Sequence, residues 1–201
     1  ATFTVKLSSQ PTANVTIGVS SSDTGEGTVS PSSLTFTSSN WNANQTVTVT
    51  GVNDYLDDGN QSYTIVLAAA SSSDSGYSGL NPNDVSVTNT DDETAGFTVS
   101  SISGSTTEAG GTATFTVKLN SQPTANVTIG VSSSDTGEGT VSPSSLTFTS
   151  SNWNANQTVT VTGVNDYLDD GNQSYTIVLA AASSSDSGYS GLNPNDVSVT
   201  N

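Results

Sequence analysis

The sequence contains no cysteine, methionine or histidine, and these absences exclude several kinds of chemistry. Without cysteine there are no disulfides and no thiolate nucleophiles, and without histidine there is no imidazole for acid–base catalysis. Positive charge is also scarce, because 18 Asp and Glu residues face only Lys6 and Lys118, which leaves a net charge of −16. Binding to nucleic acid or to an anionic membrane surface needs clustered basic side chains. We therefore expect neither kind of partner.

Long apolar runs are missing as well. No segment approaches the roughly 18–20 consecutive apolar residues of a membrane span, and hydrophobic residues make up 31% of the chain. We therefore expect no membrane insertion. Ser, Thr, Asn, Gly and Ala dominate instead, which is typical of secreted bacterial surface proteins and predicts an extracellular or cell-surface location.

An internal repeat organises the chain. Residues 1–89 recur as residues 113–201 with a period of 112 residues, and they differ at one position, where Ser8 corresponds to Asn120. A unit of about a hundred residues can close its own core, so we predict two domains, 1–93 and 94–201. The first repeat lacks its first strand in the chain as given. Either the chain is a window from a longer array, or a neighbouring molecule supplies the strand by addition to an exposed edge.

Alternation of apolar and polar residues is the main local signal, and helical periodicity is absent. In the complete copy it predicts seven short strands, near residues 96–100, 113–119, 127–131, 146–148, 158–162, 175–179 and 197–199. Gly, Pro, Asn and Ser separate these strands. The fold class expected is all-β, with tandem seven-stranded antiparallel β-sandwich repeats of the immunoglobulin-like type.

Acidic residues gather in three loops of the predicted sandwich. The loops follow the fifth strand (Asn53, Asp54, Asp57 and Asp58, with copies Asp166, Asp169 and Asp170), follow the seventh (Asp91, Asp92 and Glu93) and precede the second (Glu108). Antiparallel topology allows all three loops to lie at one end. Two carboxylates about 4 Å apart repel by roughly 4 kcal/mol at an effective dielectric near 20, so convergence requires a cation. Oxygen ligands without His or Cys favour Ca²⁺. Without convergence, these residues are solvated loop acids.

Several segments resemble the Calx-β repeat. They are Glu108-Ala-Gly-Gly-Thr-Ala-Thr-Phe-Thr-Val, Thr158-Val-Thr-Val-Thr-Gly-Val-Asn-Asp-Tyr, Tyr175-Thr-Ile-Val-Leu and a closing Asp-Asp-Glu. That family is a seven-stranded, calcium-binding sandwich of sodium–calcium exchangers and of tandem arrays in bacterial surface adhesins. The resemblance implies that Glu108 is an early ligand, that Asp54 and Asp166 match the acid ending the fifth strand, and that the turn and triplet acids complete the site. Asn53 stands where an acid is common.

We expect no enzymatic activity, because the acids lie in short turns without a pocket-forming insertion. The leading hypothesis is a non-catalytic, calcium-stiffened stalk module of a large bacterial surface adhesin. The alternative is a subunit of a self-assembling extracellular filament or surface layer that uses strand addition between chains. Expected partners are neighbouring repeats or identical subunits, with any surface ligand bound by a distant domain.

Overall fold

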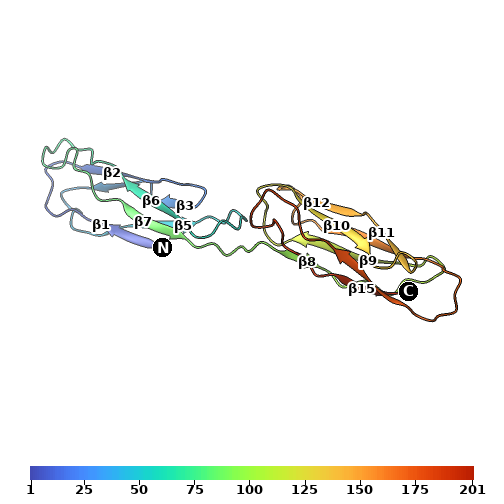
Figure 1. Cartoon of the computed structure of the whole chain (residues 1–201). Helices are drawn as coiled ribbons and strands as arrows, with labels where there is room; N and C mark the ends of the chain where they lie inside the picture. Colours follow the sequence, from blue (N-terminus) through green and yellow to red (C-terminus); the bar gives the residue numbers. More distant parts are fainter. The chain divides into compact units, whose positions relative to one another are not determined.

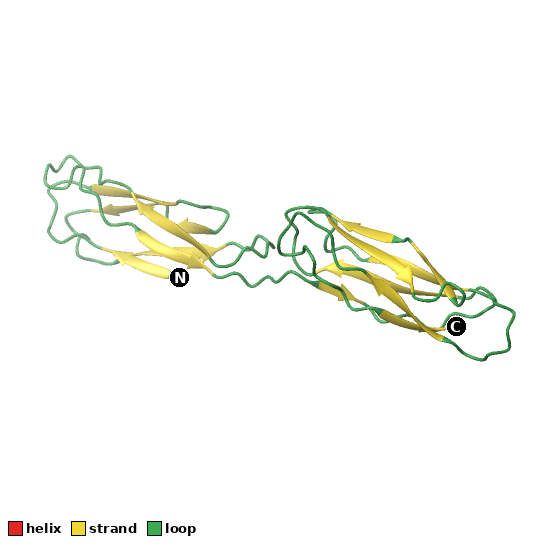
Figure 2. Cartoon of the chain, viewed as in Figure 1, coloured by secondary structure: helices red, strands yellow, loops and turns green.

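The structure is a computed structural model that describes residues 1–201, and it contains strands, turns and loops but no helix (Figure 2). It accordingly has no helical segment with the length and apolar character of a membrane span. Internal contacts divide the chain into two compact units. The first comprises Ala1–Asp54 and Asp58–Asp91, and the second comprises Tyr55–Asp57 and Asp92–Asn201. The expected all-β class is confirmed.

The first unit is a sandwich of two antiparallel sheets, with strand orders β1-β5-β3 and β4-β2-β6-β7 (Figure 1). Its strands are β1 (Thr2–Val5), β2 (Val15–Ser21), β3 (Gly27–Ser30), β4 (Ser33–Phe36), β5 (Gln45–Gly51), β6 (Gln61–Leu67) and β7 (Val85–Asn89). The chain passes from one sheet to the other between β3 and β4, at Pro31. In this arrangement β1 is an edge strand, paired on one side only, with β5.

The second unit repeats this sandwich and adds a strand. Its sheets have the orders β11-β13-β9-β8 and β12-β10-β14-β15. The strands are β8 (Phe97–Val99), β9 (Thr112–Leu119), β10 (Val127–Ser133), β11 (Gly139–Ser142), β12 (Ser145–Phe148), β13 (Gln157–Gly163), β14 (Ser174–Leu179) and β15 (Val197–Thr200). Seven of them lie in the predicted positions. The eighth, β11, was not predicted, because Val141 is its one apolar residue.

Each core lies between the two sheets and contains the apolar residues of the alternating pattern. On β9, Phe115 and Val117 are almost fully buried, and Phe115 is the register partner of Val159 on β13, also fully buried. The threonines between them point outward, where a β-branched side chain fits a half-exposed sheet surface. Each fully buried side chain of this size contributes roughly 1.5–3 kcal/mol. Burial of one face therefore fixes the strand register.

Strand register also brings particular loops together. In the second unit, Thr112 at the start of β9 pairs with Thr162 near the end of β13, and Gly139 at the start of β11 pairs with Gly163. At the same end, the backbones of Gln173 and Asn201 exchange two hydrogen bonds of 3.1 and 2.8 Å. The loops before β9, before β11 and after β13 therefore share one end with the end of β15.

Candidate metal centre

Three carboxylates of the second unit meet at this end of the sandwich. Glu108 comes from the loop before β9, and Asp166 and Asp170 come from the loop after β13. Each offers a carboxylate oxygen, and these oxygens all lie within 4.8 Å of one another. Glu108 and Asp166 are half-buried, whereas Asp170 is exposed. The sequence analysis expected these three acids to converge, and the structure does bring them together.

The loop before β9 places Glu108 through backbone contacts. Thr107 and Gly111 form an isolated bridge around a turn in which Gly110 has a positive φ of 83°. The amide of Gly163, at the end of β13, donates to the Gly111 carbonyl at 3.0 Å. A Cβ on Gly163 would collide with the carbonyl oxygen of Thr107. Only glycine fits there, and this close approach of the two backbones brings Glu108 next to Asp166.

The loop after β13 is shaped by its own polar side chains. Asn165 Oδ1 accepts a hydrogen bond from the Tyr167 amide at 2.8 Å, and Asp166 Oδ1 accepts one from the Leu168 amide at 2.9 Å. Tyr167 has a positive φ of 64°, which is uncommon for a residue other than glycine. These two Asx turns hold Asp166 and curl the chain so that Asp170, four residues later, faces the same point.

The first unit has a matching cluster with a different third member. Asp54 and Asp58 correspond to Asp166 and Asp170, and the third carboxylate is Glu26, again with all three oxygens within 4.8 Å. Glu26 lies in the turn before β3, and its carbonyl accepts a hydrogen bond from the Val52 amide at 3.0 Å. The sequence analysis did not predict Glu26. Its turn reaches this end because β3 pairs with β5, and β3 could not be identified from a single apolar residue.

The other predicted acidic ligands lie outside both clusters. Asp91 accepts a hydrogen bond from the Gly59 amide at 2.6 Å within the first unit. Asp57 accepts one from the Ala95 amide at 2.7 Å, and both of these residues belong to the second unit. The remaining predicted acids that do not join a triad are Asp92, Glu93 and Asp169, and the predicted amide ligand Asn53 directly precedes the cluster residue Asp54. Five of the predicted residues therefore gather, and the acidic triplet after β7 does not.

Two equivalent asparagines, Asn89 at the end of β7 and Asn201 directly after β15, support the acidic end of each sandwich. The Asn89 side-chain amide donates to Glu26 Oε2 at 3.2 Å and to the Val52 carbonyl at 2.7 Å. Asn201 makes the same two contacts in the second unit, to Glu138 at 3.3 Å and to the Val164 carbonyl at 3.0 Å. The final residue of β7 is thus tied to a carboxylate of the cluster.

Electrostatics at this end act on a buried tyrosine as well. Burial raises the pKa of Tyr63, and the nearby charge of Glu26 raises it further. The Tyr63 hydroxyl lies against Gly27, where a Cβ would collide with it. The negative charge of Glu26 therefore acts on the Tyr63 hydroxyl, at the end of the first unit where the core meets the cluster.

The clusters have the chemistry of a hard-cation site. Each contributes three carboxylates and no nitrogen or sulfur ligand, which suits Ca²⁺ or Mg²⁺ better than Zn²⁺ or copper. Two unit charges 4.8 Å apart repel by about 1 kcal/mol in bulk water and by about 3 kcal/mol at an effective dielectric near 20. A bound divalent cation relieves this repulsion. The arrangement could therefore hold a metal ion in each unit.

Tandem antiparallel sandwiches with an acidic cluster at one end define a class of β-sandwich repeat with a capacity for metal ions. The family can be named from the sequence. Residues 1–94 and residues 89–200 each match the family profile described as Calx-beta domain. The chain therefore belongs to the Calx-beta family, as the motifs around Glu108, Thr158 and Tyr175 indicated.

Solved structures offer distant likenesses. The chain is similar to the crystal structure of CBD12 from CALX1.2, with 14% identity over 90% of this chain and 74% of that one and a TM-score of 0.39. It is also similar to the structure of surface layer protein SbsC, domains 1-6, with 19% identity, coverage of 92% and 19%, and a TM-score of 0.33. The chain thus spans about a fifth of that second protein. No curated protein matches it. At these TM-scores neither likeness carries an argument about function.

Proposed function

We propose that the chain is a non-catalytic, calcium-binding repeat module that stiffens an extracellular stalk, in the manner of a large bacterial surface adhesin. One observation carries the proposal: the same end of both units gathers three carboxylates within 4.8 Å. Oxygen-only ligands and a net charge of −16 favour a divalent cation. The ligands are Glu26, Asp54 and Asp58 in the first unit and Glu108, Asp166 and Asp170 in the second.

Stiffening follows from where the clusters lie along the chain. In the first unit β7 ends at Asn89, whose side chain binds the cluster residue Glu26. An ion held by Glu26, Asp54 and Asp58 thereby fixes the point at which the chain leaves the sandwich. Without the ion, repulsion among the three acids favours an open and more mobile loop. Calcium then makes the connection between neighbouring repeats more rigid. Any adhesive ligand is bound by a distant domain.

Calorimetric titration of the whole chain with calcium tests the proposal. We expect two sites per chain, in the millimolar to submillimolar range of about 10⁻⁴–10⁻³ M for extracellular modules. Asp166→Asn should remove one site and Asp54→Asn the other. The control is Asp92→Asn, which removes the same charge from an exposed position outside both clusters. Two undiminished sites in both cluster variants would refute the assignment.

Small-angle scattering tests the stiffening itself. In calcium the chain should have a larger radius of gyration and a larger maximum dimension than in EDTA, where bending between repeats shortens the chain on average. The profile of the double variant Asp54→Asn, Asp166→Asn should not respond to either condition. Identical profiles of the wild-type chain with and without calcium would leave a metal site with no mechanical role.

An assembly role is the second candidate, as a filament or surface-layer subunit joined by strand addition. The observation that favours it is that each unit has sheet edges without a partner strand, such as the outer sides of β4 and β12. It predicts oligomers in solution, whereas the stalk predicts monomers. Light scattering over a range of protein concentrations distinguishes the two.

A further inference from the structure

One peptide bond at the acidic end of the first unit has a sequence that favours a spontaneous rearrangement. Two aspartates of the chain, Asp58 and Asp170, are followed by glycine, and no asparagine is. The Asp58 side chain is exposed, and Gly59 has a positive φ of 75°. A Cβ on Gly59 would meet nothing within 4 Å, so there is open space beside its nitrogen. No side chain therefore blocks the approach of this nitrogen to the carboxyl carbon of Asp58.

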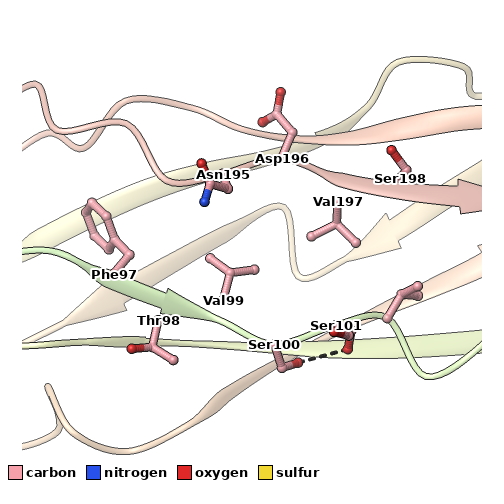
Figure 3. A pocket seen from close by; sticks show the side chains of 10 residues that line it. Phe97, Thr98, Val99, Ser100, Ser101, Asn195, Asp196, Val197 and Ser198 are labelled. Atoms are coloured by element: carbon pink, nitrogen blue, oxygen red, sulfur yellow. Dashed lines mark hydrogen bonds between the residues drawn. The ribbon is translucent and has the colours of Figure 1, made fainter.

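Other exposed aspartates lack this freedom, and Asp196 is an example (Figure 3). Its carboxylate points away from the Val197 side chain and accepts a hydrogen bond from the Leu179 amide at 2.9 Å. Val197 begins β15 and pairs with Ile177, so its backbone is held in a sheet. Its β-branched side chain is also stiff and crowds the nitrogen. Asp196 is therefore the internal reference for the behaviour of Asp58.

The peptide between Asp58 and Gly59 is held at both of its polar atoms. The Gln61 side chain donates to the Asp58 carbonyl at 2.9 Å, and the Gly59 amide donates to Asp91 Oδ2 at 2.6 Å. The Asp91 amide in turn donates to Asn60 Oδ1 at 3.0 Å, which ties the same two segments together. To attack the Asp58 side chain, the Gly59 nitrogen must lose its proton and turn out of this arrangement. The hydrogen bond to Asp91 opposes both movements.

We propose that Asp58 is a site of spontaneous isomerisation and that Asp91 restrains it. The Gly59 nitrogen attacks Cγ of Asp58, so that an N–Cγ bond forms while the Cγ–OH bond breaks. The hydroxyl leaves with the amide proton as water, and the product is a five-membered succinimide ring. Water then opens the ring at Cγ to restore aspartate, or at the former backbone carbonyl to give isoaspartate. The reaction needs no oxidant, reductant or enzyme.

Isomerisation changes the acidic cluster as well as the backbone. In isoaspartate the main chain gains a methylene group and the arm that carries the carboxylate loses it. The carboxylate of residue 58 is then displaced from those of Glu26 and Asp54, whose oxygens lie within 4.8 Å of it in the structure. Asp91, which lies outside the cluster, thereby protects one of its members. The loss of a calcium ligand rests on the proposed function, whereas the isomerisation itself does not.

The experiment incubates the whole chain in EDTA and follows isoaspartate at each position. Labelling by an isoaspartyl methyltransferase gives the total, and electron-transfer fragmentation in a mass spectrometer gives the position. The identical repeats are separated by trypsin, because cleavage after Lys6 and Lys118 places Asp58 and Asp170 on different fragments. Each chain thus reports both Asp-Gly sites at once.

Removal of the hydrogen-bond acceptor should accelerate the reaction at one site. We expect isoaspartate to accumulate at Asp58 and none to form at Asp196. Asp91→Ala should raise the rate at Asp58 about three- to tenfold, as expected for the loss of one hydrogen bond, and should leave the rate at Asp170 unchanged. Asp91→Asn keeps an acceptor oxygen and should stay close to the wild-type rate. Asp92→Ala removes the neighbouring charge and should have no effect.

A second variant gives a faster measurement of the same attack. In Asp58→Asn ammonia leaves in place of water, and the new carboxylate adds a negative charge that isoelectric focusing detects. Asp58→Asn combined with Asp91→Ala should deamidate about three- to tenfold faster than Asp58→Asn alone.

Two results would overturn the proposal. One is an Asp91→Ala rate equal to or below that of the matched chain with Asp91, since Asp91 would then be without effect or would assist the reaction. The other is no isoaspartate at Asp58 in Asp91→Ala over a period in which a free peptide of residues 56–61 isomerises. Calcium should slow the reaction in the wild-type chain, because it holds the Asp58 carboxylate. A rate unaffected by calcium would count against the calcium site and not against the isomerisation.

Discussion

Phe97 lies edge-on against Tyr189 in the second unit, with the ring planes at 63°, while the identical tyrosine of the first repeat, Tyr77, lines an open groove. The same sandwich sequence is therefore present once with its closing strand and once without it. The chain contains its own internal comparison, and several predictions use it.

Phe97→Ala should destabilise the second unit alone. Phe97 is half-buried, so the expected loss is about 1–3 kcal/mol, below the value for a fully buried phenylalanine. Urea unfolding followed by tryptophan fluorescence measures it. In a Trp41→Phe background the remaining Trp153 reports the second unit. In a Trp153→Phe background Trp41 reports the first, whose midpoint should not move; equal shifts in both backgrounds would contradict the packing described.

Glu26→Gln and Glu138→Gln should have unequal effects on calcium affinity. Glu26 belongs to the cluster of the first unit, whereas Glu108 takes the third place in the second unit, where Glu138 is a hydrogen-bond partner of Asn201. We expect Glu26→Gln to weaken one site tenfold or more, which is about 1.4 kcal/mol. Glu138→Gln should weaken the other site less. Calorimetric titration compares them, and equal losses would make Glu138 a direct ligand.

Gly163→Ala should damage the second metal centre through the backbone. The added Cβ would meet the Thr107 carbonyl and displace the loop that carries Glu108. Overpacking of this kind costs about 1–3 kcal/mol of stability, and calcium affinity at that unit should fall with it. Gly104→Ala is the matched control, because a Cβ there meets no atom within 4 Å. An unchanged calcium affinity for Gly163→Ala would show that the position of the loop carrying Glu108 does not affect metal binding.

Acid should weaken both units through a pair of equivalent aspartates. Hydrogen bonds from the Thr12 and Gly76 amides lower the pKa of Asp74. For Asp186, burial raises the pKa, but the Thr124 and Gly188 amides outweigh it and leave it lowered. A carboxyl with a lowered folded-state pKa binds fewer protons in the folded than in the unfolded state. Its stabilisation is thus present above the ordinary value of 3.8 and is lost as pH falls through the folded-state pKa.

Asp74→Asn and Asp186→Asn should therefore flatten the acid limb of the stability curve, each in its own unit. Denaturant midpoints between pH 6 and pH 2 would measure this. Asp92→Asn, which changes an exposed carboxyl, should follow the wild-type curve. Parallel acid limbs for all three variants would show that the two hydrogen-bonded carboxylates do not govern acid sensitivity.

Sequence patterning was enough to predict the β-sandwich and most of its strands, because alternation reports burial of one face directly. Strands with four apolar positions, such as β9, leave no ambiguity about the buried face. Strands β3 and β11 contain a single valine each, Val29 and Val141, and they form because β5 and β13 have an unpaired side to receive them. Pairing of that kind depends on tertiary neighbours and has no local pattern.

The dependence on tertiary neighbours also explains which residues of the candidate metal site could be predicted from the sequence. Glu108, Asp166 and Asp170 could be brought together from strand order, since their loops adjoin strands predicted from the sequence. Glu26 could not, because its position depends on the register between β3 and β5. The triplet beginning at Asp91 was expected at the site because it follows β7 closely, yet Asp91 caps the amide of Gly59 instead. Proximity along a loop does not determine where a carboxylate points.

The two repeats differ at one position only, and this near-identity has a consequence for folding. Strands β5 and β13 are identical, so β1 and β9 find the same partner surface on either. Only the shorter chain separation within each repeat favours the correct partner, and loop-closure entropy grows slowly with length. Pairing of a strand from one repeat with a strand from the other therefore competes with correct folding. This misfolding should increase when identical domains are refolded side by side at high concentration.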